Sequence, residues 1–183
     1  AASDVYKRQL YGRAELLEAL PPFLTGGSMI TRVGLQDAEY MPAPIKFEAG
    51  TQRVSQAVAF AAAVRYLQHL GMENVEAWEH ELGARLVEGV QKIEGVRLLG
   101  PADPSKRAGL VALAIDGVHP HDVGQLLDTR GIAVRVGHHC AQPLHRCAGV
   151  TASTRASTYI YNTTEDVDAF LKALAEVRPY FGF

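Results

Sequence analysis

The spacing of apolar residues in the middle of the chain predicts two consecutive helices. From residue 55 to residue 70, apolar side chains recur at intervals of three and four, which is typical of a helix, and their number predicts a buried one. A second stripe of the same period covers residues 74–93. Gly71 and Gly95 stand where the two helices should end, because glycine adopts the left-handed cap conformation readily.

After Gly95 the pattern changes to short runs typical of strands. Strands are expected at residues 96–99, 110–115, 132–136 and 156–161. Helices are expected at residues 121–129 and 164–178, where Thr163 or Thr164 can cap the second one. We therefore predict an α/β fold: an α+β small domain at residues 96–180, with short strands covered on one face by helices.

The N-terminal part of the chain is less regular. Residues 13–20 have a short helical pattern that Pro21 and Pro22 end. Residues 23–51 contain Gly26-Gly27 and several prolines and are expected to be a loop-rich segment, and long loops are often functional. Residues 1–9, AASDVYKRQ, have no period and are expected to be a non-native or disordered leader.

Composition narrows the class of protein. The chain has 183 residues, 48% of them hydrophobic, which suffices for a real core, and its net charge of −2 gives no sign of a nucleic-acid or membrane surface. No apolar run approaches the ~18 residues of a membrane span. Two cysteines are not a disulfide framework, so we expect a cytoplasmic protein with reduced thiols.

The segment RVGHHCAQP, residues 135–143, is the densest group of chemically reactive side chains. A metal site would draw on His138, His139, Cys140, His145 and Cys147, but this spacing fits none of the common zinc patterns. Neighbouring side chains of an extended segment also point to opposite faces. The two cysteines are not in a C-x-x-C motif, which disfavours a redox pair.

Two interpretations of Cys140 then stay open. As a nucleophile it needs an accessible loop; Gly137 supplies flexibility, and Arg135 and the imidazoles favour the thiolate. As a structural cysteine it would be buried, the commonest fate of a free thiol. Spacing alone does not decide between them.

Several motifs, in order along the chain, resemble one family. They are GGSMI at 26–30, FEAGT at 47–51, DVGQLLDTRGIAVRVGHHCAQP at 122–143 and RASTYIYNTTEDVDAF at 155–170. Together they resemble the SUF-type cysteine desulfurase and selenocysteine lyase branch of the class V aminotransferases. The resemblance implies the C-terminal portion of a fold-type I PLP-dependent transferase. Residues 10–70 would end its large cofactor domain, and residues 71–183 would form its small domain.

The resemblance also implies a reaction. These enzymes use pyridoxal 5′-phosphate (PLP) to take sulfur from L-cysteine, which leaves L-alanine and an enzyme persulfide. Cys140 matches the nucleophile, and Arg155 matches the arginine that binds the substrate carboxylate, a role that suits its bidentate fork. Without the family, an arginine at the start of a strand would be expected in a surface ion pair.

Other family positions are matched as well. Gly50 and Thr51 match the loop that reaches the cofactor phosphate of the partner subunit, which implies a homodimer. Arg135, His138 and His139 match the active-site loop, where they would tune the thiol, position the loop or only hold its shape.

The chain departs from the family in its lysines. None of them lies in the Ser-x-His-Lys-like context of the lysine that links the cofactor covalently: Lys7, Lys46, Lys92, Lys106 and Lys172. The isolated chain is therefore expected neither to bind PLP covalently nor to turn over.

Three hypotheses about function follow. The parent protein is a cysteine desulfurase that passes sulfur to an acceptor protein of the SUF system for iron–sulfur cluster assembly. Alternatively, it is a selenocysteine lyase acting on L-selenocysteine, or another class V PLP enzyme. In the third hypothesis the chain is a non-catalytic dimerisation or binding fragment.

Overall fold

The computed structural model describes residues 10–183, and the chain divides into two compact units. The first unit ends at His69, and the second comprises Leu70–Phe183. The leader expected at residues 1–9 lies outside the described residues. No helix in the described part of the chain is long and apolar enough to cross a membrane.

The first unit contains more regular structure than the sequence predicts. Helix α2 (Ala14–Ala19) forms as expected and ends ahead of the two prolines. Residues 23–51 are rich in loops, as expected, but they also contain a hairpin of strands β1 (Ile30–Val33) and β2 (Ala38–Tyr40), which the sequence did not predict. A short 3₁₀ helix, η1 (Ile45–Phe47), follows.

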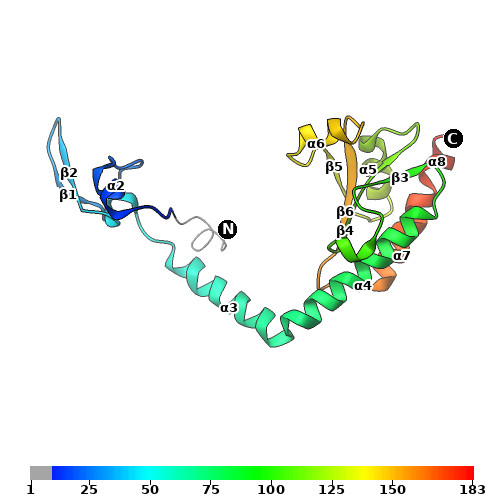
Figure 1. Ribbon diagram of the computed structural model, residues 1–183, viewed down its shortest axis with the longest axis horizontal. Helices are drawn as coiled ribbons and strands as arrows, with labels where there is room; N and C mark the ends of the chain where they lie inside the picture. Colours follow the sequence, from blue (N-terminus) through cyan, green and yellow to red (C-terminus); the bar gives the residue numbers. More distant parts are fainter. Residues whose placement is uncertain (1–9) are drawn as a thin grey trace. The chain divides into compact units, whose positions relative to one another are not determined.

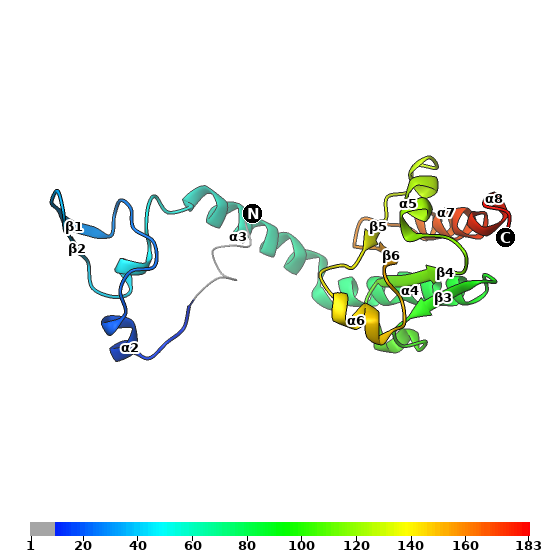
Figure 2. The ribbon, with the colours of Figure 1, turned by 90° about the horizontal axis from the view of Figure 1, so that it is seen from above.

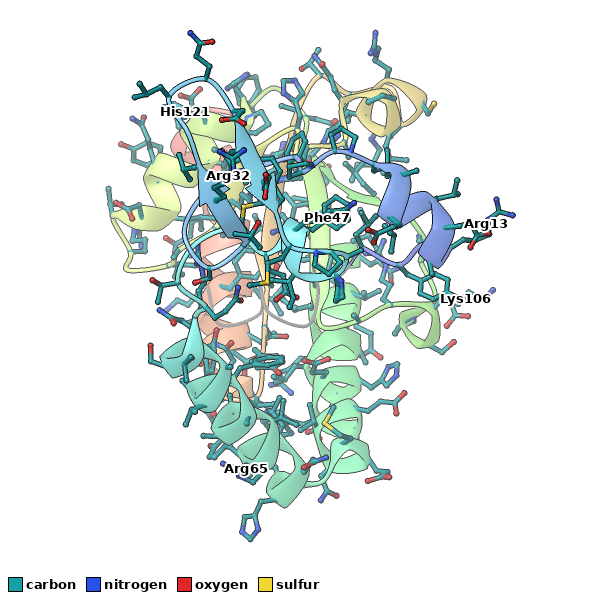
Figure 3. All side chains as sticks on the ribbon, turned by 90° about the vertical axis from the view of Figure 1, so that its left-hand side faces the viewer. Arg13, Arg32, Phe47, Arg65, Lys106 and His121 are labelled. Atoms are coloured by element: carbon teal, nitrogen blue, oxygen red, sulfur yellow. The ribbon has the colours of Figure 1, made fainter. Side chains whose placement is uncertain are left out.

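The side chains of this hairpin are joined by polar contacts, and within the described chain the hairpin does not bury an apolar face. Arg32 of β1, labelled in Figure 3, donates hydrogen bonds to Asp37 at 2.6 Å and to Glu39 at 2.9 Å. All three side chains are exposed, so these ion pairs contribute little stability. Strands without an alternating apolar pattern give no period-two signal, which explains why the sequence did not predict them.

Helix α3 (Val54–Leu70) forms where it was predicted, but the expectation that it is buried is wrong. None of its residues is buried; Val58 is 64% exposed and Tyr66 is 61% exposed. Several other apolar residues of this helix, Phe60 and Leu67 among them, are only half-buried. Gly71, with φ of +85°, separates α3 from the next helix, as predicted.

The second unit is built on a four-stranded antiparallel sheet, visible in Figure 1 and, from above, in Figure 2. Its strand order is β3 (Val96–Leu99), β4 (Leu110–Ile115), β6 (Ser153–Ser157), β5 (Arg135–Gly137). A 3₁₀ helix, η2 (Pro104–Lys106), joins the first two strands. The predictions for β3 and β4 are confirmed to the residue.

The predicted bounds of the other two strands are wrong by about three residues. β5 was expected at residues 132–136 and β6 at residues 156–161. β5 begins only where β6 runs beside it, at Arg135. β6 ends earlier because the chain turns, and Asn162 accepts a hydrogen bond from the Tyr159 backbone N–H at 3.0 Å. A pairing partner thus sets the start of β5 and a turn sets the end of β6, and apolar runs encode neither.

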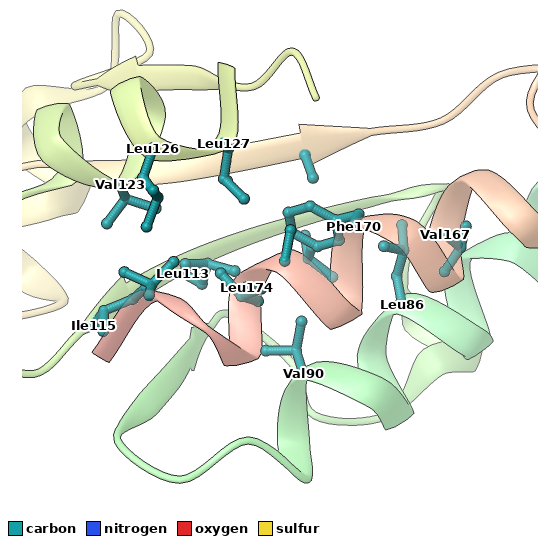
Figure 4. Packing of buried hydrophobic residues seen from close by; sticks show 14 of the residues in the cluster. Leu86, Val90, Leu113, Ile115, Val123, Leu126, Leu127, Val167, Phe170 and Leu174 are labelled. Atoms are coloured by element: carbon teal, nitrogen blue, oxygen red, sulfur yellow. The ribbon is translucent and has the colours of Figure 1, made fainter. Parts of the chain in front are cut away.

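Helices cover one face of this sheet, as predicted. They are α4 (Met72–Gln91), α5 (Pro120–Asp128), α7 (Thr164–Ala175) and the short α8 (Val177–Tyr180). Alternate residues of β4 point into the core: Val111, Leu113 and Ile115 are buried. Figure 4 shows this strand packed against Leu86 and Phe170 of the helices. The second unit therefore has one continuous hydrophobic core.

The start of α7 follows its sequence signal. The Thr163 hydroxyl accepts a hydrogen bond from the Asp166 N–H at 3.3 Å, and the Asp166 carboxylate accepts one from the Thr163 N–H at 3.0 Å. This reciprocal cap satisfies two donors that the helix itself leaves unpaired. The same hydrogen bond from Thr163, aided by one from Asn162, holds the pKa of Asp166 below its ordinary value.

The core predicts a contrast between two leucines. Leu174 of α7 is 1% exposed, whereas Leu144 is 67% exposed. Leu174→Ala should lower the free energy of unfolding by about 2–5 kcal/mol, because it leaves a cavity in the core. Leu144→Ala, the matched control, should change it by about 0.5 kcal/mol or less beyond helix propensity. Urea unfolding of both variants measures the difference; equal losses would contradict the packing described.

Candidate active site

The pairing of β5 with β6 places two arginines opposite each other. In this register Arg135 pairs with Arg155, and Gly137 pairs with Ser153. Directly opposed residues of an antiparallel pair share one face of the sheet. Arg155 also pairs with Ala112 of the central strand, so it lies inside the sheet, whereas Arg135 lies on the edge strand. Two cationic side chains are thus brought to one place.

The chain turns sharply directly after β5. His139 and Cys140 both have positive φ, +52° and +60°, a conformation that is uncommon for residues other than glycine. The Ala141 N–H closes the turn on the His138 carbonyl at 2.8 Å. This turn leaves Cys140 exposed, so the interpretation of a buried structural cysteine is wrong.

The Cys140 sulfur has a cationic neighbour. Arg135 donates a hydrogen bond from Nη2 to Cys140 Sγ, with a distance of 3.9 Å. A cation beside a sulfur favours the thiolate, which is the nucleophilic form. The second thiol, Cys147, is also exposed, but no arginine among the described residues donates a hydrogen bond to it.

An open recess surrounds the thiol. It has a volume of about 580 Å³ and is lined by Arg135, Val136, Gly137, His138, His139, Cys140, Gln142 and Pro143. Helix α6 (Gln142–Cys147) forms one side, with Pro143 in its first turn. The sequence did not predict this helix, because six residues are too few to show a helical period. A small molecule can approach Cys140 from solvent through the recess.

None of the residues that line the recess is acidic. From residue 129 to residue 164 there is neither aspartate nor glutamate. Within the described chain, Arg135 and Arg155 make no salt bridge, so Arg155 is not the surface ion pair that a lone arginine would form. The Nε atom of Arg155 is covered and has no hydrogen-bond partner among residues 10–183. Two guanidinium groups that lack an acidic partner in the described chain are suited to bind an anionic ligand such as a carboxylate.

The histidines are arranged differently from the expectation for an extended segment. The rings of His138 and His139 both lie near His145, with centroid distances of 6.0 Å and 5.6 Å. The left-handed turn breaks the alternation of an extended chain, which is why the two rings gather. Among residues 10–183, no group of three or more histidine, cysteine or acidic side chains is placed to hold a metal ion.

A buried serine links two of these histidines. The Ser153 hydroxyl lies 3.0 Å from His139 Nε2 and 2.9 Å from His145 Nε2. His145 Nδ1 lies 2.9 Å from the Ala141 carbonyl oxygen. Ser153 was absent from the sequence prediction and His145 entered it only as a metal ligand. Only the register that sets Ser153 opposite Gly137 could have revealed this group.

The pKa of His139 lies below its ordinary value. Burial is the main cause, because a covered site disfavours the charged ring. The positive charges of Arg155 and Arg135 and the neighbouring His145 ring lower it further, with Arg155 having the largest of these effects. These effects favour the neutral form of the His139 ring over the charged form.

The two predicted phosphate-binding residues belong to the other unit. Gly50 has a φ of +86°, which glycine adopts without strain, and its N–H donates to the Gly27 carbonyl at 2.9 Å. Thr51 is exposed. The structure thus groups Cys140, Arg135, His139 and Arg155 in one unit and places Gly50 and Thr51 in the other.

Comparison with known proteins identifies the family. The aminotransferase class-V family matches residues 9–170. Over 173 residues the chain is 52% identical to a probable cysteine desulfurase 2 of Mycobacterium leprae and 48% identical to a probable cysteine desulfurase of Streptomyces coelicolor. Each match covers 94% of this chain and 41% of the relative.

Solved structures of cysteine desulfurases also match this chain. The cysteine desulfurase CsdA of Escherichia coli, in its S-sulfonic acid form, matches with a TM-score of 0.79 and 36% identity over 93% of this chain and 42% of that protein. The apo cysteine desulfurase of Thermococcus onnurineus matches with a TM-score of 0.78 and 39% identity, over 91% of this chain and 42% of that protein.

The chain therefore belongs to the class V aminotransferases, a family of PLP-dependent enzymes, and is related to the cysteine desulfurases. It spans about two fifths of the length of the curated relatives that it matches. The predicted fold class is confirmed, since the chain matches part of the cysteine desulfurase fold.

The contact between Arg135 and Cys140 predicts a difference in thiol reactivity. In a Cys147→Ser background, Arg135→Gln should slow alkylation of Cys140 by iodoacetamide about two- to fivefold at neutral pH, the range of an exposed charge contact. Arg146→Gln removes the same charge from the exposed surface of α6 and is the matched control. Equal slowing by both variants would show that net charge alone, without the contact, governs the reactivity.

Proposed function

We propose that the chain is the C-terminal portion of a PLP-dependent cysteine desulfurase, in which Cys140 takes sulfur from L-cysteine. The main observation behind this proposal is that the exposed Cys140 thiol lies next to Arg135. The turn with this thiol follows β5, and β5 pairs with β6, the strand of Arg155. The relatives described as probable cysteine desulfurases support the same reaction class.

In this proposal Cys140 acts as the nucleophile. Its thiolate attacks the sulfur of L-cysteine, so a sulfur–sulfur bond forms while the carbon–sulfur bond of the substrate breaks. The electron pair of the broken bond stays on carbon, which takes up a proton and becomes the methyl group of L-alanine. The products are L-alanine and a Cys140 persulfide, and no external oxidant or reductant is required.

Arg155 would hold the substrate during this attack. Its guanidinium group is half-buried and lacks an acidic partner in the described chain, so a substrate carboxylate can occupy it without displacing an existing ion pair. A bidentate contact fixes the orientation as well as the position of a carboxylate. Arg135, directly opposite, would add positive charge at the same site and stabilise the thiolate.

The residues of the first unit fit a cofactor phosphate in part. When bound, PLP supplies the electron sink for the bond changes at the substrate. Thr51 is exposed and can donate its hydroxyl to a phosphate oxygen. The Gly50 N–H is already bonded to Gly27, so we assign Gly50 the role of shaping the turn and Thr51 the contact itself.

None of the four described lysines places a free amino group beside the Cys140 thiol. Lys46 is buried and donates to the Glu18 carbonyl at 2.6 Å within the first unit. Lys92, Lys106 and Lys172 do not line the recess around Cys140. We therefore propose that covalent attachment of PLP depends on a lysine of the parent protein outside this chain, and that the isolated chain is inactive.

The wider assignment follows from the family. We propose that residues 10–70 end the large cofactor domain and residues 71–183 form the small domain, that the parent is a homodimer, and that Thr51 serves the partner's cofactor. The persulfide would pass to a sulfur-acceptor protein for iron–sulfur cluster assembly in the cytoplasm.

Replacing each thiol in turn tests the proposal in the full-length parent protein. Cys140→Ser should reduce sulfide release from L-cysteine, measured with a reductant present, by about a thousandfold or more, because the nucleophile is lost. Cys147→Ser, the matched control, should retain activity. Absorbance of bound PLP should be the same in both variants. Wild-type sulfide release by Cys140→Ser would refute the assignment and direct attention to Cys147.

A further inference from the structure

The hydrogen-bonded group of His139, Ser153 and His145 has no role in the reaction proposed above. Ser153 is fully buried and His145 is 6% exposed. Their three contacts form one chain, from His139 through the Ser153 hydroxyl to His145 and on to the Ala141 carbonyl. Hydrogen bonds in such a chain need a consistent direction, because each donor requires an acceptor.

The contact between His145 and the Ala141 carbonyl determines which atom donates in each of these hydrogen bonds. A carbonyl oxygen only accepts, so His145 Nδ1 carries a proton and donates to Ala141. In a neutral His145 ring, Nε2 is then bare and accepts the single proton of the Ser153 hydroxyl. The Ser153 oxygen must in turn accept from His139, so His139 Nε2 carries a proton and its Nδ1 is bare.

The alternative with a charged His145 is unfavourable. His145 Nε2 would then donate to Ser153, whose proton would point to His139 Nε2. His139 Nδ1 would carry a proton, yet this atom is covered and has no partner in the described chain. No carboxylate contacts these rings among the described residues, whereas Arg155 opposes positive charge at His139. Two neutral rings of opposite tautomer therefore satisfy the contacts best.

We infer that Ser153 and His145 are positioning residues that clamp the Cys140 turn on both sides. Through Ser153, the clamp holds the side chain of His139, the residue before Cys140. Through His145, it holds the carbonyl of Ala141, the residue after Cys140. The thiol itself stays outside the clamp and exposed. The clamp is a property of the fold, and only its benefit to sulfur transfer rests on the proposed function.

The clamp requires a neutral His139 ring, so it should depend on pH. His139 faces Arg155 on β6, His145 on α6 and Arg135 on β5, and the His138 ring lies on the other side of His145. Since the pKa of His139 in the folded chain is below the ordinary value of 6.5, the neutral ring contributes stability that is present above pH 6.5. This contribution is lost as the pH falls through the lowered pKa.

Nuclear magnetic resonance of the histidine rings tests the clamp. In the 183-residue chain labelled with ¹⁵N in histidine, at pH 8, His139 should be protonated on Nε2 and His145 on Nδ1. Ser153→Ala should abolish this fixed pattern, and Ser153→Thr, which keeps the hydroxyl, should restore it. Ser157→Ala, at an exposed position of the same strand, is the matched control and should change neither ring. Unchanged tautomers in Ser153→Ala would overturn the clamp.

Hydrogen exchange supplies a second readout. Exchange of the Ala141 amide, which closes the turn, should accelerate about tenfold in Ser153→Ala, after correction for intrinsic rates. In the wild type it should accelerate as the pH is lowered through the pKa of His139. If Ser153→Ala does not fold, the wild-type tautomers and pH response decide alone, and a ring pattern other than the one stated refutes the clamp. None of these readouts depends on desulfurase activity, so failure of that proposal would leave them interpretable.

Discussion

The antiparallel register between β5 and β6 is the constraint on which the candidate site depends. It sets Arg135 opposite Arg155 and Gly137 opposite Ser153. A slip of one residue would move every side chain of β5 to the other face of the sheet, which would separate the arginines and move the turn away from Ser153. The position of β6 is fixed because it pairs with β4 on its other side, and alternate residues of β4 are buried in the core.

This register has one destabilising consequence, which is charge repulsion, and one stabilising consequence, which is a group of hydrogen bonds. Like charges placed opposite each other on neighbouring strands repel, and no acidic residue at positions 129–164 relieves the repulsion. The hydrogen bonds among His139, Ser153 and His145 act in the other direction and tie the turn to the sheet. A site that concentrates positive charge around an accessible thiol is suited to hold anionic groups, both a thiolate and a substrate carboxylate.

The sequence predicted the elements whose signal is local. β3 and β4 have apolar runs, and α7 has its own cap in Thr163, so their positions were confirmed. The motif around Cys140 also pointed to the correct family. Features that depend on distant partners were not predictable: the bounds of β6, the exposure of α3, and the contact of Ser153 with two histidines. The left-handed conformation of His139 and Cys140 reversed the expected directions of neighbouring side chains, which no pattern of residue types reveals.

Mapping the persulfide tests the central claim most directly. The full-length protein is incubated with L-cysteine, trapped with an alkylating reagent and digested, and its peptides are analysed by mass spectrometry. The account predicts one additional sulfur atom on the peptide that contains Cys140 and none on Cys147. Additional sulfur on Cys147 alone, or on neither thiol during turnover, would contradict the assignment of Cys140 as the residue that accepts sulfur.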